Sequence, residues 1–357
     1  MADKTDLEFL EQLIAAPSPS GYEAPVRALL KQVLAPLADS CETDMMGNLI
    51  LRLAGSGNGK PRVMLTAHCD EIGFLIKHID DNGFVRFSAI GGVDPHIVPG
   101  HRVHVVTGNG LVPGVVGRKP IHLLDAKDKE RISPITEQFI DIGCSSKEEA
   151  EAVAAVGDPV VFVDGLQRLQ GKRLAARAFD DKVGVFAVAQ AFRQLATGPR
   201  PDAEVVALFS VQEELGLRGA VTGTYGVRPD IALAIEIGHA SDTPGSEPHL
   251  VGEVKLGNGP AISRGPNINH QLFALLQEVA RRNGIPLQIV GEQRATSTDA
   301  NVVQLSRRGV ATSLLRVPTR YVHTPSEVVD FSDVQQVVDL LVATVAEIRQ
   351  RDDFLPE

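Results

Sequence analysis

The chain of 357 residues is poor in several features, and each shortage excludes a class of protein. It contains only three cysteines, Cys41, Cys69 and Cys144, and no Cys-x-x-Cys pair. An odd number of cysteines without such a pair indicates neither a disulfide framework nor a thiolate zinc site. No internal repeat or low-complexity tract is evident. With 43% hydrophobic residues, the chain can bury a large core, so we expect a globular protein.

Long apolar stretches and runs of basic residues are also missing. No uninterrupted apolar segment reaches membrane-spanning length, and residues 1–7 lack the basic and apolar regions of a signal peptide. We therefore expect a cytoplasmic protein that does not bind membranes. Acidic residues outnumber basic ones by 45 to 35, which gives a formal charge of -10. Because nucleic-acid binding needs a basic patch, no nucleic-acid partner is expected.

The sequence alternates between helical and strand-like segments, with one stretch of different texture. From residue 72 to about 164, short apolar segments alternate with Gly, Pro and Asp-Asn-Gly punctuation, which predicts a β-rich unit. The flanking segments alternate helices and strands, which is typical of an α/β sheet. We expect one α/β domain, residues 1–71 plus 165–357, with residues 72–164 inserted as a β-rich domain.

The individual elements are predicted from apolar spacing. The expected helices cover 7–14, 26–34, about 181–195, 268–282, 299–308 and 332–350. The expected strands cover 48–53, 62–67, 203–211, 231–237, 287–290 and 312–317.

Candidate metal ligands recur after the apolar strands, where ligands of open α/β sheets bind. The candidates are His68 and Asp70 after 63–67, Asp180 beside Asp181, Glu213 and Glu214 after 203–211, Glu236 within 231–237, and His323 after 312–317. Divalent cations bind anionic oxygens and neutral imidazoles. Two cations roughly 3.5–4 Å apart also need a shared carboxylate to offset their repulsion. This set of residues matches what a two-metal hydrolase requires.

Each candidate alone also has an ordinary structural explanation. A single histidine is more often a core or surface group, and Asp180-Asp181 reads most simply as a helix N-cap with an acid in the first turn. Adjacent acids such as Glu213-Glu214 usually form a solvated face. Two acids directly after an apolar strand favour a metal site, however, because buried charges are costly unless a cation offsets them.

Several strings together point to a known family. They are Ser20-Gly21-Tyr22-Glu23, Ala67-His68-Cys69-Asp70-Glu71-Ile72-Gly73-Phe74, Ala178-Phe179-Asp180-Asp181-Lys182-Val183-Gly184, Gln212-Glu213-Glu214-Leu215-Gly216-Leu217-Arg218-Gly219-Ala220, Arg264-Gly265-Pro266, Thr298-Asp299-Ala300 and Pro318-Thr319-Arg320-Tyr321-Val322-His323-Thr324-Pro325. In these strings the chain resembles the M42 metallo-aminopeptidases of the tetrahedral-aminopeptidase and glutamyl-aminopeptidase type. The resemblance spans nearly the whole chain in order.

The resemblance implies a fold and a role for each candidate residue. The implied fold is a zinc-peptidase-like three-layer α/β/α catalytic domain carrying an inserted β-rich dimerisation domain, PDZ-like or a barrel. The implied roles are Asp180 as the bridge between two metals, His68 and Glu236 completing one site, Glu214 and His323 completing the other, Glu213 as general base on a bridging water, and Asp70 as the residue that orients His68. The peptide bond between Asp180 and Asp181 is typically cis in such enzymes. This family usually has Asp at the position of Glu236.

The implied function is an aminopeptidase that removes residues from the amino end of peptides, using two divalent ions per subunit. Zinc or cobalt is expected and manganese is possible, since His/carboxylate sites accept all three. Dimers are expected to assemble into a dodecamer. Two other interpretations stay open: a related dinuclear deacylase or carboxypeptidase, and a metal-binding scaffold without turnover. The scaffold would be favoured by a missing base or ligand, and none is missing.

Overall fold

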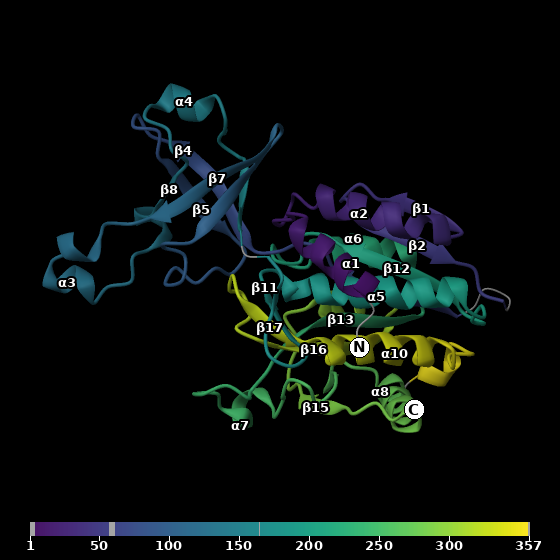
Figure 1. Cartoon of the computed structure of the whole chain (residues 1–357). Helices are drawn as coiled ribbons and strands as arrows, with labels where there is room; N and C mark the ends of the chain where they lie inside the picture. Colours follow the sequence, from purple (N-terminus) through teal and green to yellow (C-terminus); the bar gives the residue numbers. More distant parts are fainter. Residues whose placement is uncertain (1–3, 57–60, 164, 356–357) are drawn as a thin grey trace.

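The computed structural model describes residues 4–56, 61–163 and 165–355. Asp164, the expected end of the inserted domain, lies outside the described residues. The described chain forms a large mixed sheet between two layers of helices, and a separate small barrel (Figure 1). No described helix is long and apolar enough to cross a membrane.

The large sheet has parallel strands at its centre and antiparallel strands toward both edges. In sheet order the strands are β1 (Ser40–Thr43), β2 (Leu49–Leu53), β12 (Glu204–Ser210), β3 (Arg62–His68), β13 (Ile231–His239), β16 (Ala311–Arg320), β17 (Glu327–Asp330), β11 (Arg173–Ala176) and β10 (Gln167–Arg168), with β14 (Ala261–Arg264) and β15 (Gln288–Gly291) attached at β16. The parallel strands β12, β3, β13 and β16 are almost entirely buried because helices cover both of their faces.

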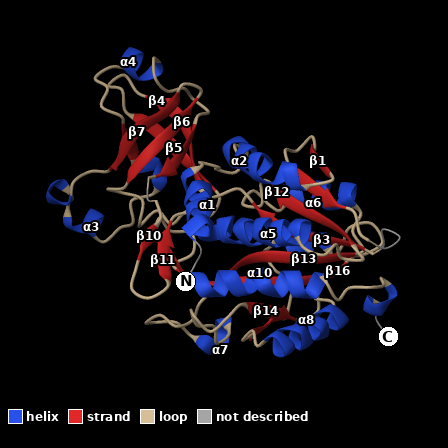
Figure 2. Cartoon of the chain, turned by 45° about the vertical axis from the view of Figure 1, so that its right-hand side comes forward, coloured by secondary structure: helices blue, strands red, loops and turns tan. Residues whose placement is uncertain are grey.

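Two helical layers complete the three-layer fold (Figure 2). Packed on one face are α1 (Lys4–Ala15), α2 (Ala24–Leu34), α5 (Phe179–Thr197), α8 (His270–Asn283) and α10 (Phe331–Val345). Packed on the other face are α6 (Arg218–Val227) and α9 (Asp299–Val303), while the short α7 (Pro248–Val251) lies in a loop. Helix α5 is the most deeply buried, and it contacts α1, α10 and four central strands. The α/β class and the three layers expected from the sequence are confirmed.

The inserted β-rich unit is a closed antiparallel barrel of six strands. In barrel order these are β4 (Gly73–Ile79), β5 (Val85–Ile90), β8 (Phe139–Asp141), β7 (Gly110–Gly117), β6 (Arg102–Thr107) and β9 (Pro159–Phe162), with the short helices α3 (Ala126–Lys129) and α4 (Lys147–Glu151) in its loops. Its core is separate from that of the sheet. The ring of Phe74 packs edge-on against Phe87 and Phe162, at centroid distances of 4.9 and 5.3 Å.

Some predicted elements differ from the structure. The helix expected over 299–308 ends at Val303, and turns with positive φ at Arg307 and Gly309 follow it before the chain enters β16. The last helix ends at Val345 and not near residue 350. Helix α6 has no counterpart in the predictions, because its glycines and threonines interrupt the apolar spacing.

Candidate metal centre

The candidate residues meet at the carboxyl end of the parallel strands, although they come from five separate segments. His68 ends β3, Glu236 lies near the end of β13, and Asp180 stands at the beginning of α5. Glu214 follows β12, and His323 follows β16. The register pairs Ser210 of β12 with His68, so the loop after β12 begins beside that histidine.

Two groups of donor atoms form around Asp180. In each group the possible ligand atoms all lie within 4.8 Å of one another. In the first, His68 Nε2 is 3.1 Å from Asp180 Oδ1 and 3.3 Å from Glu236 Oε1. In the second, His323 Nε2 is 3.2 Å from Asp180 Oδ2 and 3.1 Å from Glu214 Oε1. Asp180 therefore gives one oxygen to each group.

The backbone around Asp180 is unusual. Ala178 has a φ of 58°, and the peptide bond between Asp180 and Asp181 is cis, as the resemblance implied. The buried carboxylate of Glu327 accepts hydrogen bonds from Asp180 N at 2.9 Å and from His323 N at 2.8 Å. This one side chain therefore fixes two segments of the centre. The sequence analysis did not identify Glu327, although an acid at the start of the apolar string Glu-Val-Val-Asp was a signal that could have found it.

Asp70 holds the loop that carries the two glutamates. Its Oδ1 accepts a hydrogen bond from Glu213 N at 3.0 Å, and its Oδ2 accepts from Glu214 N at 3.1 Å and from Ser20 Oγ at 2.6 Å. His68 Nδ1 lies 3.1 Å from the backbone oxygen of Asp70 and 3.5 Å from its Oδ1. The histidine therefore contacts the Asp70 backbone more closely than the Asp70 carboxylate.

Glu213 lies beside the donor groups but in neither of them, among the residues that the structure describes. Burial, with the nearby carboxylates of Glu236 and Asp299, raises the pKa of Glu213 to about 10. Although Glu213 and Glu214 are adjacent in sequence, their side chains have different surroundings. Glu214 contacts His323, and Glu213 does not share that contact.

The electrostatics of the centre fit a cation. Burial raises the pKa of Glu236 to about 7, and hydrogen bonds with Asp180 and Glu214 raise the pKa of His323 to about 11. Carboxylates this crowded repel one another and stabilise protons on the histidines. A divalent cation would supply the same positive charge to the same nitrogen and oxygen atoms, which are suitable ligands for zinc. The donor set therefore fits a divalent metal in each group.

The inserted barrel also reaches this centre. His323 Nδ1 lies 2.9 Å from the backbone oxygen of Gly92, in the loop after β5. A Cβ on the neighbouring Gly91 would lie 3.1 Å from Glu214 Oε2, so this glycine lets the loop approach the carboxylate closely. The sequence analysis missed this contact, and the Gly91-Gly92 pair was its only signal.

The sequence is similar to known aminopeptidases over nearly the whole chain. The sequence model of the M42 glutamyl aminopeptidase family matches residues 47–340. The lysyl aminopeptidase of Pyrococcus furiosus is 37% identical over 354 residues, which cover 98% of this chain and 99% of that protein.

The fold is also similar to solved structures of aminopeptidases over nearly the whole chain. The TET aminopeptidase of the Thaumarchaeota archaeon SCGC AB-539-E09 superposes with a TM-score of 0.91 at 32% identity, covering 97% of this chain and 98% of that one. The TET1 peptidase of Pyrococcus horikoshii, which can assemble into a tetrahedron or a large octahedral shell, superposes with a TM-score of 0.86 at 34% identity, covering 96% of this chain and all of that one. Because its sequence and its fold match over nearly the whole chain, the chain belongs to the M42 family of aminopeptidases.

Proposed function

We propose that this protein hydrolyses amino-terminal residues from peptides with two divalent metal ions. The observation that carries the proposal is the position of Asp180, which gives one oxygen to each of the two donor groups. A carboxylate in this position is what two neighbouring cations require. His68 and Glu236 would complete one site, and Glu214 and His323 the other. Zinc or cobalt suits these ligands, and manganese is also compatible.

The resemblance implies Asp at the position of Glu236, and we propose that the glutamate takes the same role as a ligand of the first site. Its Oε1 lies 3.3 Å from His68 Nε2, so the longer side chain still places an oxygen in the donor group.

Bound ions would polarise the scissile carbonyl and lower the pKa of the attacking water. Bound cations beside Glu213 would lower its pKa, which burial and the neighbouring acids otherwise raise to about 10. Its carboxylate could then act as general base, taking a proton from the water and passing it to the leaving amine. Its position supports this role, because its carboxyl interacts electrostatically with His68, Glu236 and Glu214 although it belongs to neither donor group. Asp70 is a positioning residue in this scheme, since it binds the backbone amides of Glu213 and Glu214.

Two other functions use the same centre. A dinuclear deacylase or carboxypeptidase would share these ligands but recognise a substrate carboxylate, and a scaffold would bind metal without turnover. The relatives favour the aminopeptidase, since the matched family and the Pyrococcus furiosus protein are both named for that activity.

The proposal extends to assembly. Residues 72–164 would pair two subunits, and six dimers would form a dodecamer whose active sites face inward. The support is the similarity to a TET1 peptidase that forms a tetrahedron, over 96% of this chain. A closed shell would admit short or unfolded peptides and exclude folded proteins.

Replacing Glu213 with Gln tests the mechanism. The variant should keep its metal content and lose at least about 10²–10⁴-fold in kcat, because a general base is removed and no ligand is. Glu214→Gln is the matched comparison: it should lose metal as well as activity. Metal analysis and initial rates on a peptide measure both effects. Near-normal turnover by Glu213→Gln would refute the role of this residue.

A further inference from the structure

Side chains from distant segments hold the Glu213 loop, which runs from Val211 to Glu214. Each of its four backbone amides donates to such a side chain. The bonds are Val211 N to Asn48 Oδ1 at 3.1 Å, Gln212 N to Glu23 Oε1 at 3.1 Å, Glu213 N to Asp70 Oδ1 at 3.0 Å, and Glu214 N to Asp70 Oδ2 at 3.1 Å. Three side chains from separate parts of the chain therefore fix this loop.

Within the loop, Gln212 has the most unusual backbone. Its φ is 55°, in the left-handed region that residues other than glycine rarely adopt. A residue keeps such a conformation only where its surroundings hold it there. Gln212 N is held by Glu23, and Gln212 O accepts a hydrogen bond from Arg218 N at 3.2 Å. Because Gln212 directly precedes Glu213, a relaxed backbone at Gln212 would move the side chain of Glu213.

Glu23 is directed toward this loop and not toward its own helix. It is the N-cap residue of α2, but its side chain makes no capping hydrogen bond. An acid at this position usually accepts from the first turn of its own helix. Glu23 Oε1 instead accepts from Gly21 N at 2.6 Å and from Gln212 N. Glu23 is 4% exposed, so little water reaches its carboxyl group.

The segment from Ser20 to Glu23 is anchored on two further sides. Ser20 Oγ donates to Asp70 Oδ2 at 2.6 Å. Tyr22 OH donates at 2.8 Å to the backbone oxygen of Gly157, which precedes strand β9 of the barrel. Glu23 therefore extends from a fixed segment, and a fixed segment can hold a strained residue in place.

We propose that Glu23 is a positioning residue, which sets the place of the Glu213 carboxylate by holding Gln212. This inference rests on the proposed role of Glu213 as general base. Glu23 belongs to neither donor group, and without it Asp70 would still hold Glu214 N. A general base works only within hydrogen-bond reach of the proton that it takes. A displaced Glu213 should therefore slow turnover without loss of substrate or metal binding.

Glu23→Ala tests the proposal. Its kcat should fall by at least about tenfold, because small displacements of a reacting group are costly, whereas KM should change by less than about threefold. Its metal content should equal that of the unmodified protein. Glu23→Gln should restore kcat to within about threefold, since an amide oxygen accepts the same two hydrogen bonds. Glu23→Asp withdraws the oxygens by one methylene group, so it should also lose kcat if Glu23→Ala is too unstable to purify.

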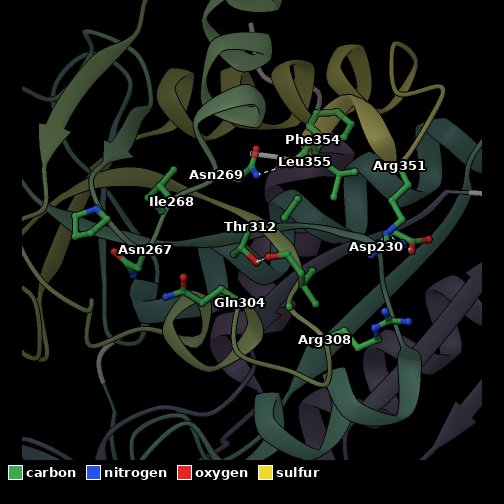
Figure 3. A pocket seen from close by; sticks show the side chains of 14 residues that line it. Asp230, Asn267, Ile268, Asn269, Gln304, Arg308, Thr312, Arg351, Phe354 and Leu355 are labelled. Atoms are coloured by element: carbon green, nitrogen blue, oxygen red, sulfur yellow. Dashed lines mark hydrogen bonds and ion pairs between the residues drawn. The ribbon is translucent and has the colours of Figure 1, made fainter. Parts of the chain in front are cut away.

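Asn269→Ala is the matched control for a general loss of stability. Asn269 is the N-cap residue of α8, and its Nδ2 holds a distant segment by donating to Phe354 O at 2.8 Å (Figure 3). It lies at the end of the sheet opposite the donor groups, where its backbone N donates to Thr312 O near the beginning of β16. The variant should lower the melting temperature and keep kcat within about twofold.

Several results would overturn the proposal. Full kcat in folded Glu23→Ala or Glu23→Asp would do so, as would loss of metal from either variant, because Glu23 would then support the ligands. An equal loss of kcat in Glu23→Gln and Glu23→Ala would show that charge matters and the hydrogen bonds do not. A matching fall in Asn269→Ala would show that kcat reports stability alone. Near-normal turnover by Glu213→Gln is a different failure, since it refutes the proposed base itself.

Discussion

At the residue scale, single carboxylates organise several segments at once. Asp70 accepts hydrogen bonds from Ser20 and from the backbone of Glu213 and Glu214, and Glu327 does the same for Asp180 and His323. The motif strings could predict the residues that now lie around Asp180, because ligand types at strand ends are visible in sequence. They could not predict Glu327, because its hydrogen bonds go to backbone atoms that only the fold brings near.

Glu71 is a buried acid whose charge should stabilise the fold in a pH-dependent way. It is 2% exposed and pairs with Arg177 and with Lys182, the latter at 2.9 Å. Although burial opposes ionisation, the two cations lower the pKa of Glu71 from 4.5 to about 2. Burial lowers the pKa of Lys182 to about 8, and the nearby charge of Arg177 also lowers it. The surroundings of Glu71 therefore favour its ionised form.

Because its folded pKa is depressed, Glu71 stabilises the protein above pH 4.5, and this contribution is lost as the pH falls toward 2. The shift corresponds to about 3 kcal/mol. Glu71→Gln should therefore lower the melting temperature strongly at pH 7, and the gap from the unmodified protein should narrow toward pH 3. The exposed Glu278, paired with Arg281, gives the control Glu278→Gln, which should leave the melting temperature nearly unchanged at both pH values. An equal gap at both pH values would contradict the assignment.

At the element scale, the long periodic helices and the buried parallel strands were predictable, whereas α6 and several edge strands were not. The parallel strands β3, β12, β13 and β16 read as apolar runs because both of their faces are covered. Helix α6 begins where the turn after β12 ends, and Asn48 joins them: its Oδ1 accepts from Val211 N at 3.1 Å and its Nδ2 donates to Gly219 O at 2.9 Å. The sequence of α6 lacks a helical apolar stripe, so its apolar spacing does not predict this helix.

Gly219 permits this close packing of α6. A Cβ at this position would lie 2.3 Å from Val211 O and 2.4 Å from Asn48 Oδ1. Gly219→Ala should therefore destabilise the protein by about 1–3 kcal/mol and reduce activity, because the turn that carries Glu213 must shift. Gly226→Ala in the same helix is the control: nothing lies within 4 Å of its Cβ position, and it should be neutral or stabilising by up to about 1 kcal/mol. Thermal melting and initial rates measure both variants, and equal behaviour would rule out the steric explanation.

At the scale of the whole molecule, the barrel and the sheet have separate hydrophobic cores, and a loop of the barrel contacts the candidate metal centre. The loop after β5 places Gly91 against Glu214 and the backbone oxygen of Gly92 against His323. The sequence predicted an insertion from its turn-rich texture. It could not predict this contact, because the two glycines have no side chains that would mark a role at the centre.

Assembly can be measured on the whole molecule by light scattering. The proposed dodecamer predicts the mass of twelve 38.2-kDa chains for the metal-loaded protein. Deletion of the barrel is a poor test, because its loop supports His323. A stable monomer would contradict the assembly and leave the proposed chemistry intact.

The central claim is that two metal ions, joined by Asp180, are required for peptide hydrolysis. The most direct measurement follows metal content and activity together while metal is removed by a chelator and then restored. We predict two ions per chain at full activity, complete loss of activity on removal, and recovery on restoration. Asp180→Ala should lower the metal content more than His323→Ala, because it removes a ligand from both sites. Full activity in metal-free protein, or saturation of activity at one ion per chain, would contradict the account.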